Sequence, residues 1–164
     1  MTETQYRITE YINQAINVFN EHEGYLISRD LSERCICAKF AMYLDRILSN
    51  SEFSTYIVDV EYNRGRHGNE YLSKRLGHRN IVVDLIVHKR GFDQENGFDN
   101  LICIEMKKAY KNYSLSSDMA RLQTLTDNTS GFGYKAGFMI VADSNKITNE
   151  HILRIEQSYY HVDF

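Results

Sequence analysis

The sequence predicts an α/β domain in which helices flank a mixed β-sheet. The first 48 residues carry apolar side chains at helical spacing, whereas from residue 55 onward the apolar residues gather in short runs that are typical of strands. A helical pattern returns between the third and the fourth of these runs. The chain has 164 residues, 43% of them hydrophobic, and no proline, so we expect residues 1–164 to form a single domain without a linker.

Two helices are predicted before the first strand. Apolar residues recur at helical spacing from residue 6 to residue 22, and Gly24 follows as a stop signal. The second helix, Ser32 to Leu48, has the stronger pattern, and either Asp30 or Ser32 can cap its start.

Four strands and two further helices complete the predicted order, α-α-β-β-β-α-β-α. Residues 55 to 62 alternate β-branched and aromatic residues with acids, as a half-buried strand does. The other strands are Ile81 to His88, Leu101 to Lys107 and Ala136 to Ala142, and the helices are residues 117 to 126 and a last one from Thr148 or Asn149 through Tyr159. We expect an antiparallel meander of the first three strands, followed by a helical crossover to the fourth.

Composition and charge exclude several classes of protein. No apolar stretch reaches the ~20 residues of a membrane span, and the polar start MTETQYRITE lacks the pattern of a signal peptide, which predicts a cytoplasmic protein. The three cysteines, Cys35, Cys37 and Cys103, are therefore expected to be reduced and packed. The formal net charge of −3 gives no global basic field, so a nucleic-acid site would have to be local.

Asp84 is the residue that a simple packing role explains least. It stands in the middle of the apolar run Ile81 to Val87, where an ionised carboxylate without a partner loses several kcal/mol of hydration. The next strand carries Glu105 and Lys107, which are two positions apart and therefore share one face. If the two strands pair, these three charged side chains converge.

This constellation resembles the PD-(D/E)xK nuclease superfamily, whose core has the order α-β-β-β-α-β. The matching residues are Val83-Asp84 and, 21 positions after the aspartate, Glu105-Met106-Lys107, within residues 31 to 142. Val83 stands where the family has proline. An acid two positions before a lysine is common by chance, so the strand context carries the resemblance. The resemblance implies a restriction-endonuclease-like core with one extra N-terminal helix.

The resemblance also implies a catalytic site at Asp84, Glu105 and Lys107. Two close carboxylates repel each other, and a hard divalent cation, Mg²⁺ or Mn²⁺, reverses that interaction, so Asp84 and Glu105 are the expected metal ligands. By resemblance, the backbone carbonyl of Met106 is a further ligand and Glu33 is an accessory acidic one. The cation would activate water, while Lys107 would orient that water or stabilise the transition state.

A plain salt bridge is the alternative interpretation. In that case Lys107 neutralises Asp84 or Glu105 and no metal binds. Such a bridge leaves one carboxylate uncompensated unless Arg90 or Lys108 contributes.

A local basic region is a second functional feature. Residues 64 to 90 hold seven basic side chains and only two acidic ones, interleaved with Tyr71 and preceded by Tyr62, and can contact phosphates or bases. A solvated loop explains the same residues equally well. By resemblance, polar residues of the helix at 117 to 126 line the cleft in many superfamily members, and surface solvation explains these residues at least as well. The expected nucleic-acid contacts are Arg64, Arg66, Lys74, Arg75, Lys108, Arg121 and Gln123.

The predicted function is a Mg²⁺-dependent nuclease that hydrolyses DNA or RNA, with DNA as the favoured substrate. The alternative is a non-catalytic nuclease-like domain that binds nucleic acid or protein. A homodimer is compatible with the nuclease, because double-strand cutting by one-site nucleases generally uses two copies.

Overall fold

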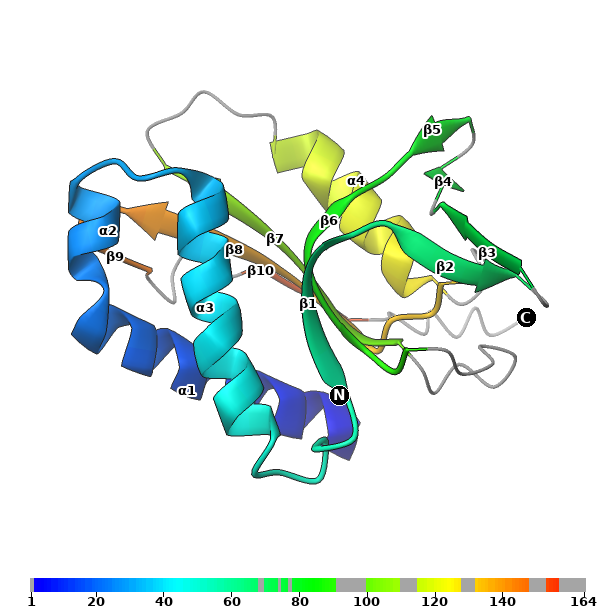
Figure 1. Cartoon of the computed structure of the whole chain (residues 1–164), viewed down its shortest axis with the longest axis horizontal. Helices are drawn as coiled ribbons and strands as arrows, with labels where there is room; N and C mark the ends of the chain where they lie inside the picture. The colour runs from blue at the N-terminus through cyan, green and yellow to red at the C-terminus, as the bar shows by residue number, and fades with distance from the viewer. Residues whose placement is uncertain are drawn as a thin grey trace, which may run out of the picture.

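The protein has an α/β fold, in which N-terminal helices precede a mixed β-sheet (Figure 1). The computed structural model describes residues 2–67, 70–73, 75–76, 78–90, 100–109, 115–127, 132–147 and 153–156.

Three helices begin the chain: α1 (Glu3–His22), α2 (Gly24–Ser28) and α3 (Glu33–Leu48). Thr2 caps α1 in a capping box with Gln5, because each side chain bonds the other residue's backbone N–H. Ser32 caps α3 by accepting from the backbone N–H of Cys35, so Ser32 and not Asp30 is the cap of the second predicted helix. The short α2 was not predicted.

The main sheet has the strand order β1-β6-β7-β8-β10. Its strands are β1 (Ile57–Tyr62), β6 (Val83–His88), β7 (Asn100–Lys108), β8 (Ala136–Asp143) and β10 (Leu153–Glu156), and the short β9 (Lys146–Ile147) also pairs with β8. β1, β6 and β7 are antiparallel neighbours, and β8 runs parallel to β7 after the crossover helix α4 (Leu115–Thr126). The predicted meander and crossover are therefore confirmed.

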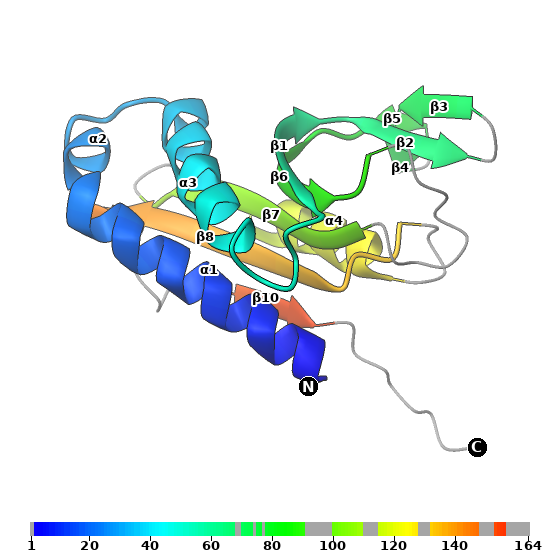
Figure 2. The same ribbon diagram turned by 60° about the horizontal axis from the view of Figure 1, so that its bottom comes forward.

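Two small hairpins lie between β1 and β6, where the sequence suggested only a loop. They are β2 (Arg64–His67) with β3 (Glu70–Ser73), and β4 (Arg75–Leu76) with β5 (Arg79–Asn80). Figure 2 shows them extending from one end of the main sheet, beyond the ends of β1 and β6.

The predicted last helix is wrong over its described part. Residues 153–156 form β10, which pairs antiparallel with the first half of β8. Leu153 and Ile155 are two positions apart, which suits a strand, and β10 supplies hydrogen-bonding partners to a strand that would otherwise be an open edge. The rest of the predicted helix, residues 148–152 and 157–159, lies outside the described residues.

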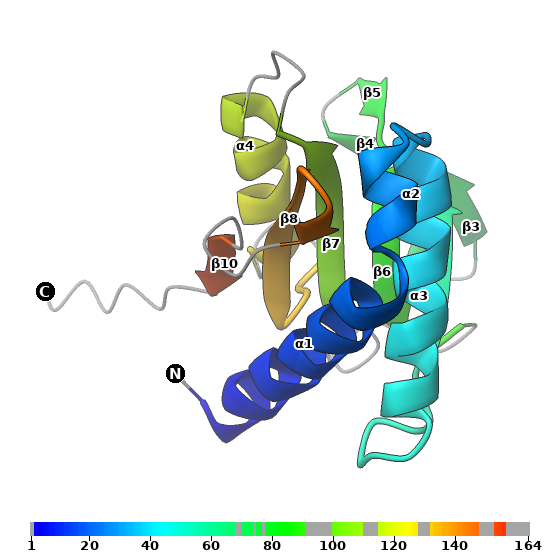
Figure 3. The same cartoon turned by 90° about the vertical axis from the view of Figure 1, so that its left-hand side faces the viewer.

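Both faces of the sheet are covered, and a separate core lies on each. One core packs against α1 and α3 and includes Ile104 and Phe138, whereas the other packs against α4 and includes Cys103 and Met139. Figure 3 shows α1 to α3 and α4 on opposite sides of the sheet. Because side chains alternate along β7, Glu105 and Lys107 belong to the α4 face.

Gly137 lets α4 approach the sheet closely. A Cβ atom at this position of β8 would lie 3.1 Å from Cγ2 of Thr126 and 3.4 Å from Sγ of Cys103. The helix contacts both β8 and β7, and the ion pair between Asp118 and Lys107 places its first turn beside β7.

Two further expectations are consistent with the described part of the chain. Cys35, Cys37 and Cys103 are free thiols, and Cys37 and Cys103 are buried as expected, whereas Cys35 is only half-buried. None of the helices described here has the length and apolar character that crossing a bilayer requires.

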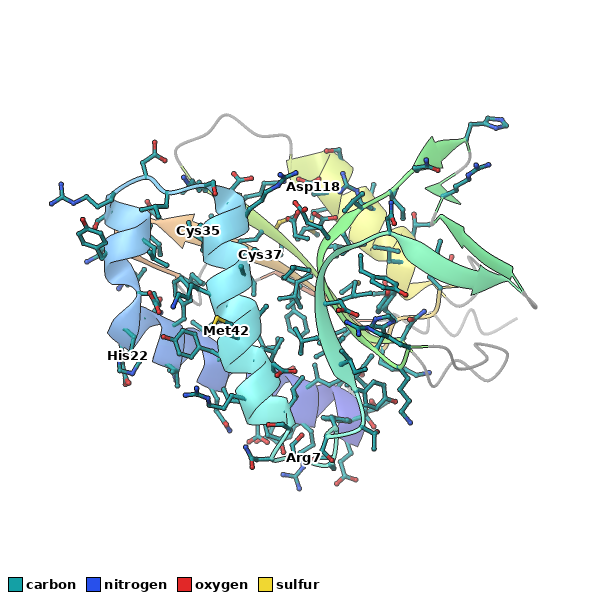
Figure 4. The ribbon with its side chains drawn as sticks, in the orientation of Figure 1. Arg7, His22, Cys35, Cys37, Met42 and Asp118 are labelled. Carbon is teal, nitrogen blue, oxygen red and sulfur yellow. The ribbon has the colours of Figure 1, made fainter. Side chains whose placement is uncertain are left out.

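The first core should depend strongly on Phe40. This side chain of α3 is fully buried and packs edge-on against Phe19, with ring centroids 6.3 Å apart. Phe40→Ala should lower the free energy of unfolding by about 3–5 kcal/mol, as measured by urea denaturation. Met42 lies on the same helix but is 60% exposed (Figure 4), so Met42→Ala should change the free energy of unfolding by less than about 0.5 kcal/mol. Equal losses in the two variants would contradict the assigned core.

Candidate active site

Asp84 lies where β6 separates from β7. The two strands pair from Leu85 opposite Ile104 onward, which places Asp84 and Glu105 at the next opposing positions. At this point a side chain takes the place of a main-chain acceptor in the hydrogen bonding between the strands. The backbone N–H of Met106 donates to Oδ2 of Asp84 over 2.8 Å. The Asp84 carboxylate is thus held at the edge of β7, half-buried beside Glu105.

Glu105 is fully buried on the α4 face. Its Oε1 accepts from Nη1 of Arg121 over 2.7 Å, while its Oε2 has no hydrogen-bond partner among the described residues. Burial first, and then the nearby Asp84 carboxylate, raise the pKa of Glu105 to about 8, although Arg121 opposes both effects. Glu105 is therefore an incompletely compensated acid.

Lys107 lies on the same face as Glu105, as the alternation along the strand predicts. Its Nζ is 3.5 Å from Oδ2 of Asp118, and its side chain is 21% exposed. Burial alone would lower the pKa of the Lys107 ammonium, but neighbouring carboxylates outweigh it and raise that pKa. These carboxylates belong to Asp118, Asp84, Glu105 and Glu33.

Asp118 is a site residue that sequence reasoning missed. It lies in the first turn of α4 (Figure 4), is 5% exposed, and accepts from Nη2 of Arg121 over 3.1 Å as well as facing Lys107. Its spacing of three from Arg121 on one helix was a usable signal, because such positions are neighbours on the helix surface. Their position over β7, however, depends on how α4 is rotated against the sheet.

Glu33 and Met106 have less direct evidence as metal ligands. Glu33 is the first residue of α3, is half-buried, and makes no hydrogen bond or ion pair with any described residue. Its charge nevertheless helps to raise the pKa of Lys107, so Glu33 lies near the site. The Met106 side chain packs in the core under α1 and α3, while its backbone N–H holds Asp84. Both ligand roles stay predictions.

The structure corrects the role expected for Lys108. This side chain is 1% exposed, and its Nζ pairs with Oδ1 of Asp30 over 2.6 Å. Because side chains alternate along β7, Lys108 lies on the face opposite Lys107, under the N-terminal helices. It is therefore not part of an exposed basic surface, and it secures the turn before α3 instead.

The other expected nucleic-acid contacts are partly described. Arg64 and Arg66 belong to β2, and Arg75 is exposed at the start of β4, where its Nε donates to Oδ1 of Asn80. Gln123 is exposed on α4, whereas Arg121 is directed at Glu105. Lys74 lies outside the described residues.

The ion pairs differ from those of the plain salt-bridge interpretation. Lys107 pairs with Asp118, and Arg121 pairs with both Glu105 and Asp118. The two other candidate cations pair elsewhere: Arg90 with Asp59, and Lys108 with Asp30. Among the described residues, the carboxylates of Asp84, Glu105 and Asp118 therefore face two cations, Lys107 and Arg121, which leaves one negative charge in excess when all are ionised.

The site fits a hard divalent cation on these grounds. Oε2 of Glu105 is buried without a partner, and carboxylate oxygens are the ligands that Mg²⁺ prefers. Cys37 responds to the same negative potential, since burial first and then Asp84, Glu61 and Glu105 raise its thiol pKa to about 12. Within the described ranges, no three His, Cys, Asp or Glu side chains are grouped to hold a metal. Asp84 and Glu105 would thus bind it together with main-chain or water oxygens.

Comparison of the chain with protein-family models, with curated proteins and with solved structures found no match.

The free energy of unfolding should depend on pH through Glu105. Its pKa rises from 4.5 to about 8 on folding, so the folded state holds a proton that the unfolded state releases, and stability falls as pH rises through this window. The slope should reach at most about 1.4 kcal/mol per pH unit. Glu105→Gln retains the acceptor for Arg121 and cannot ionise, so its profile should be flatter in urea unfolding with EDTA.

Glu21→Gln is the matched control, because Glu21 is an exposed residue of α1. It should keep the wild-type dependence on pH. Superimposable profiles of the wild type and Glu105→Gln would contradict the assigned environment of Glu105.

Proposed function

We propose that the protein is a Mg²⁺-dependent nuclease that hydrolyses phosphodiester bonds of DNA, or of RNA, at Asp84, Glu105 and Lys107. The observation that carries this proposal is the buried, unpartnered Oε2 of Glu105 next to the Asp84 carboxylate. Two acids held together at this depth repel each other, and a divalent cation between them would remove the repulsion.

Asp84 and Glu105 would hold the cation, which when bound lowers the pKa of a coordinated water and neutralises charge on a phosphate. The backbone N–H of Met106 fixes the Asp84 carboxylate in place for this role. Lys107 carries a positive charge at neutral pH, because the carboxylates around it raise its pKa. Its ammonium can orient the attacking water or stabilise the negative charge of the transition state.

Asp118 supports the same chemistry as a positioning residue. It lies 3.5 Å from Nζ of Lys107 and is itself buried, so it limits where the ammonium can point. Salt bridges of this kind fix side-chain geometry more than they stabilise the fold.

The substrate proposal rests on local charge. The hairpins at residues 64–80 carry Arg64, Arg66 and Arg75, and Gln123 is exposed on the helix above the site. Basic and polar groups in such positions contact phosphates without regard to base sequence. A homodimer and a cytoplasmic location complete the proposal as expectations.

A non-catalytic nucleic-acid-binding module is the second candidate, and the Arg121–Glu105 ion pair favours it. Arg121 already neutralises one oxygen of Glu105 without a metal. Such a module should bind labelled DNA equally well in EDTA and in Mg²⁺, as fluorescence anisotropy would measure, and should never cut it. A nuclease should cut plasmid or single-stranded DNA only when Mg²⁺ is present.

Cleavage should be abolished in one variant of the site and strongly slowed in another. Asp84→Asn removes a ligand charge and should abolish Mg²⁺-dependent strand breakage, and Lys107→Ala should slow it by at least about a hundredfold. Plasmid nicking with and without Mg²⁺ measures both effects, and circular dichroism checks that the variants are folded.

Asp45→Asn and Lys146→Ala are the matched controls, because both residues are exposed, on α3 and β9 respectively. They should cut at the wild-type rate. Equal rates in the wild type and in both site variants would remove Asp84 and Lys107 from the mechanism.

A further inference from the structure

Arg121 occupies the place in which a cation would compensate Glu105. Its Nη1 donates to Oε1 of Glu105 over 2.7 Å, and the carboxylate that it contacts is fully buried. The Arg121 side chain is 28% exposed, so it reaches inward from the rim of the site. The guanidinium is thus a positive charge in direct contact with Glu105, the proposed metal ligand.

The guanidinium is also bound to a second, independent group. Its Nη2 donates to Oδ1 of Asp118, one turn earlier on α4, and Nη1 lies 3.5 Å from the carbonyl oxygen of Val82. The contact with Asp118 lies within one helix, whereas the contact with Glu105 joins the helix to the sheet. The contact with Glu105 can therefore break while the contact with Asp118 is kept.

A divalent cation and the guanidinium cannot share Glu105 without cost. Both are positive, and at contact distances inside a protein like charges repel strongly. Arg121 also uses Oε1, one of the only two oxygens that Glu105 can offer a metal. Binding of a cation between Asp84 and Glu105 therefore favours the departure of Arg121.

We propose that Arg121 is an internal competitor for the divalent cation: it occupies Oε1 of Glu105 in the metal-free protein and leaves it, while still bound to Asp118, when a metal binds. This inference rests on the proposed metal site and deepens it. The molecule is then held in a metal-free resting state by its own side chain. The apparent metal affinity is reduced by the fraction of molecules in which Arg121 is away from Glu105.

The test is the affinity of Mn²⁺ alone for the full-length, EDTA-treated protein, measured by isothermal titration calorimetry. Arg121→Gln removes the competing charge and should bind Mn²⁺ about tenfold more tightly than the wild type. The same variant should have a lower melting temperature without metal, because Glu105 loses its ion-pair partner. Its melting temperature should also rise more on addition of Mn²⁺ than that of the wild type.

Arg46→Gln is the matched control, since it makes the same change of net charge at an exposed position in the last turn of α3. Its Mn²⁺ affinity should stay within about twofold of wild type, because a distant surface charge is screened. An equal gain in Arg46→Gln and Arg121→Gln would overturn the inference, as would an unchanged or weaker affinity in Arg121→Gln.

The conservative variant Arg121→Lys keeps the test decisive if Arg121→Gln does not fold. A lysine retains a charge near Glu105 but cannot bridge two carboxylates with one planar group, so Mn²⁺ affinity should rise by a smaller factor. An Mn²⁺ affinity of Arg121→Lys equal to that of the wild type would overturn the inference. Binding in the wild type without any gain in the variants contradicts the competition and leaves the nuclease proposal standing, whereas no binding in any protein contradicts both.

Discussion

The burial of Glu105 beside Asp84 is the constraint around which the site is arranged. A fully buried acid next to a second acid raises the free energy of the charged form, and this is why the pKa of Glu105 rises to about 8. Arg121 and Lys107 compensate the three carboxylates only in part, and one oxygen of Glu105 keeps no partner among the described residues. An arrangement that only had to be stable would be better served by apolar side chains at these positions.

The fold creates this constraint by simple steps. Antiparallel pairing of β6 and β7 brings Asp84 opposite Glu105, and the departure of β6 from β7 at that point leaves the Met106 N–H for the Asp84 carboxylate. The crossover between β7 and β8 then has to lie on one face of the sheet, and α4 carries Asp118 and Arg121 onto the face where Glu105 and Lys107 point. Close packing at Gly137 keeps the helix near enough for these contacts.

Much of this could be predicted from the sequence, because it follows from periodicity. A charge within an apolar run identified Asp84, and alternation placed Glu105 and Lys107 on one face. The same rule separates Lys107 from Lys108, whose burial against Asp30 was nevertheless not predicted. The pairing of Arg121 with Glu105 depends on the rotation of α4, which no local pattern fixes. The segment at 153–156 was misassigned because an alternation of only two apolar residues is too short a signal to separate a strand from a helix.

The central claim is that Asp84 and Glu105 together bind a divalent cation. Crystals soaked in Mn²⁺ test it most directly, because the anomalous scattering of manganese locates the ion without reference to the expected site. The account predicts one strong peak between the two carboxylates, with the Arg121 guanidinium withdrawn from Glu105. A map with no peak there, and with Arg121 still bound to Glu105, would contradict it.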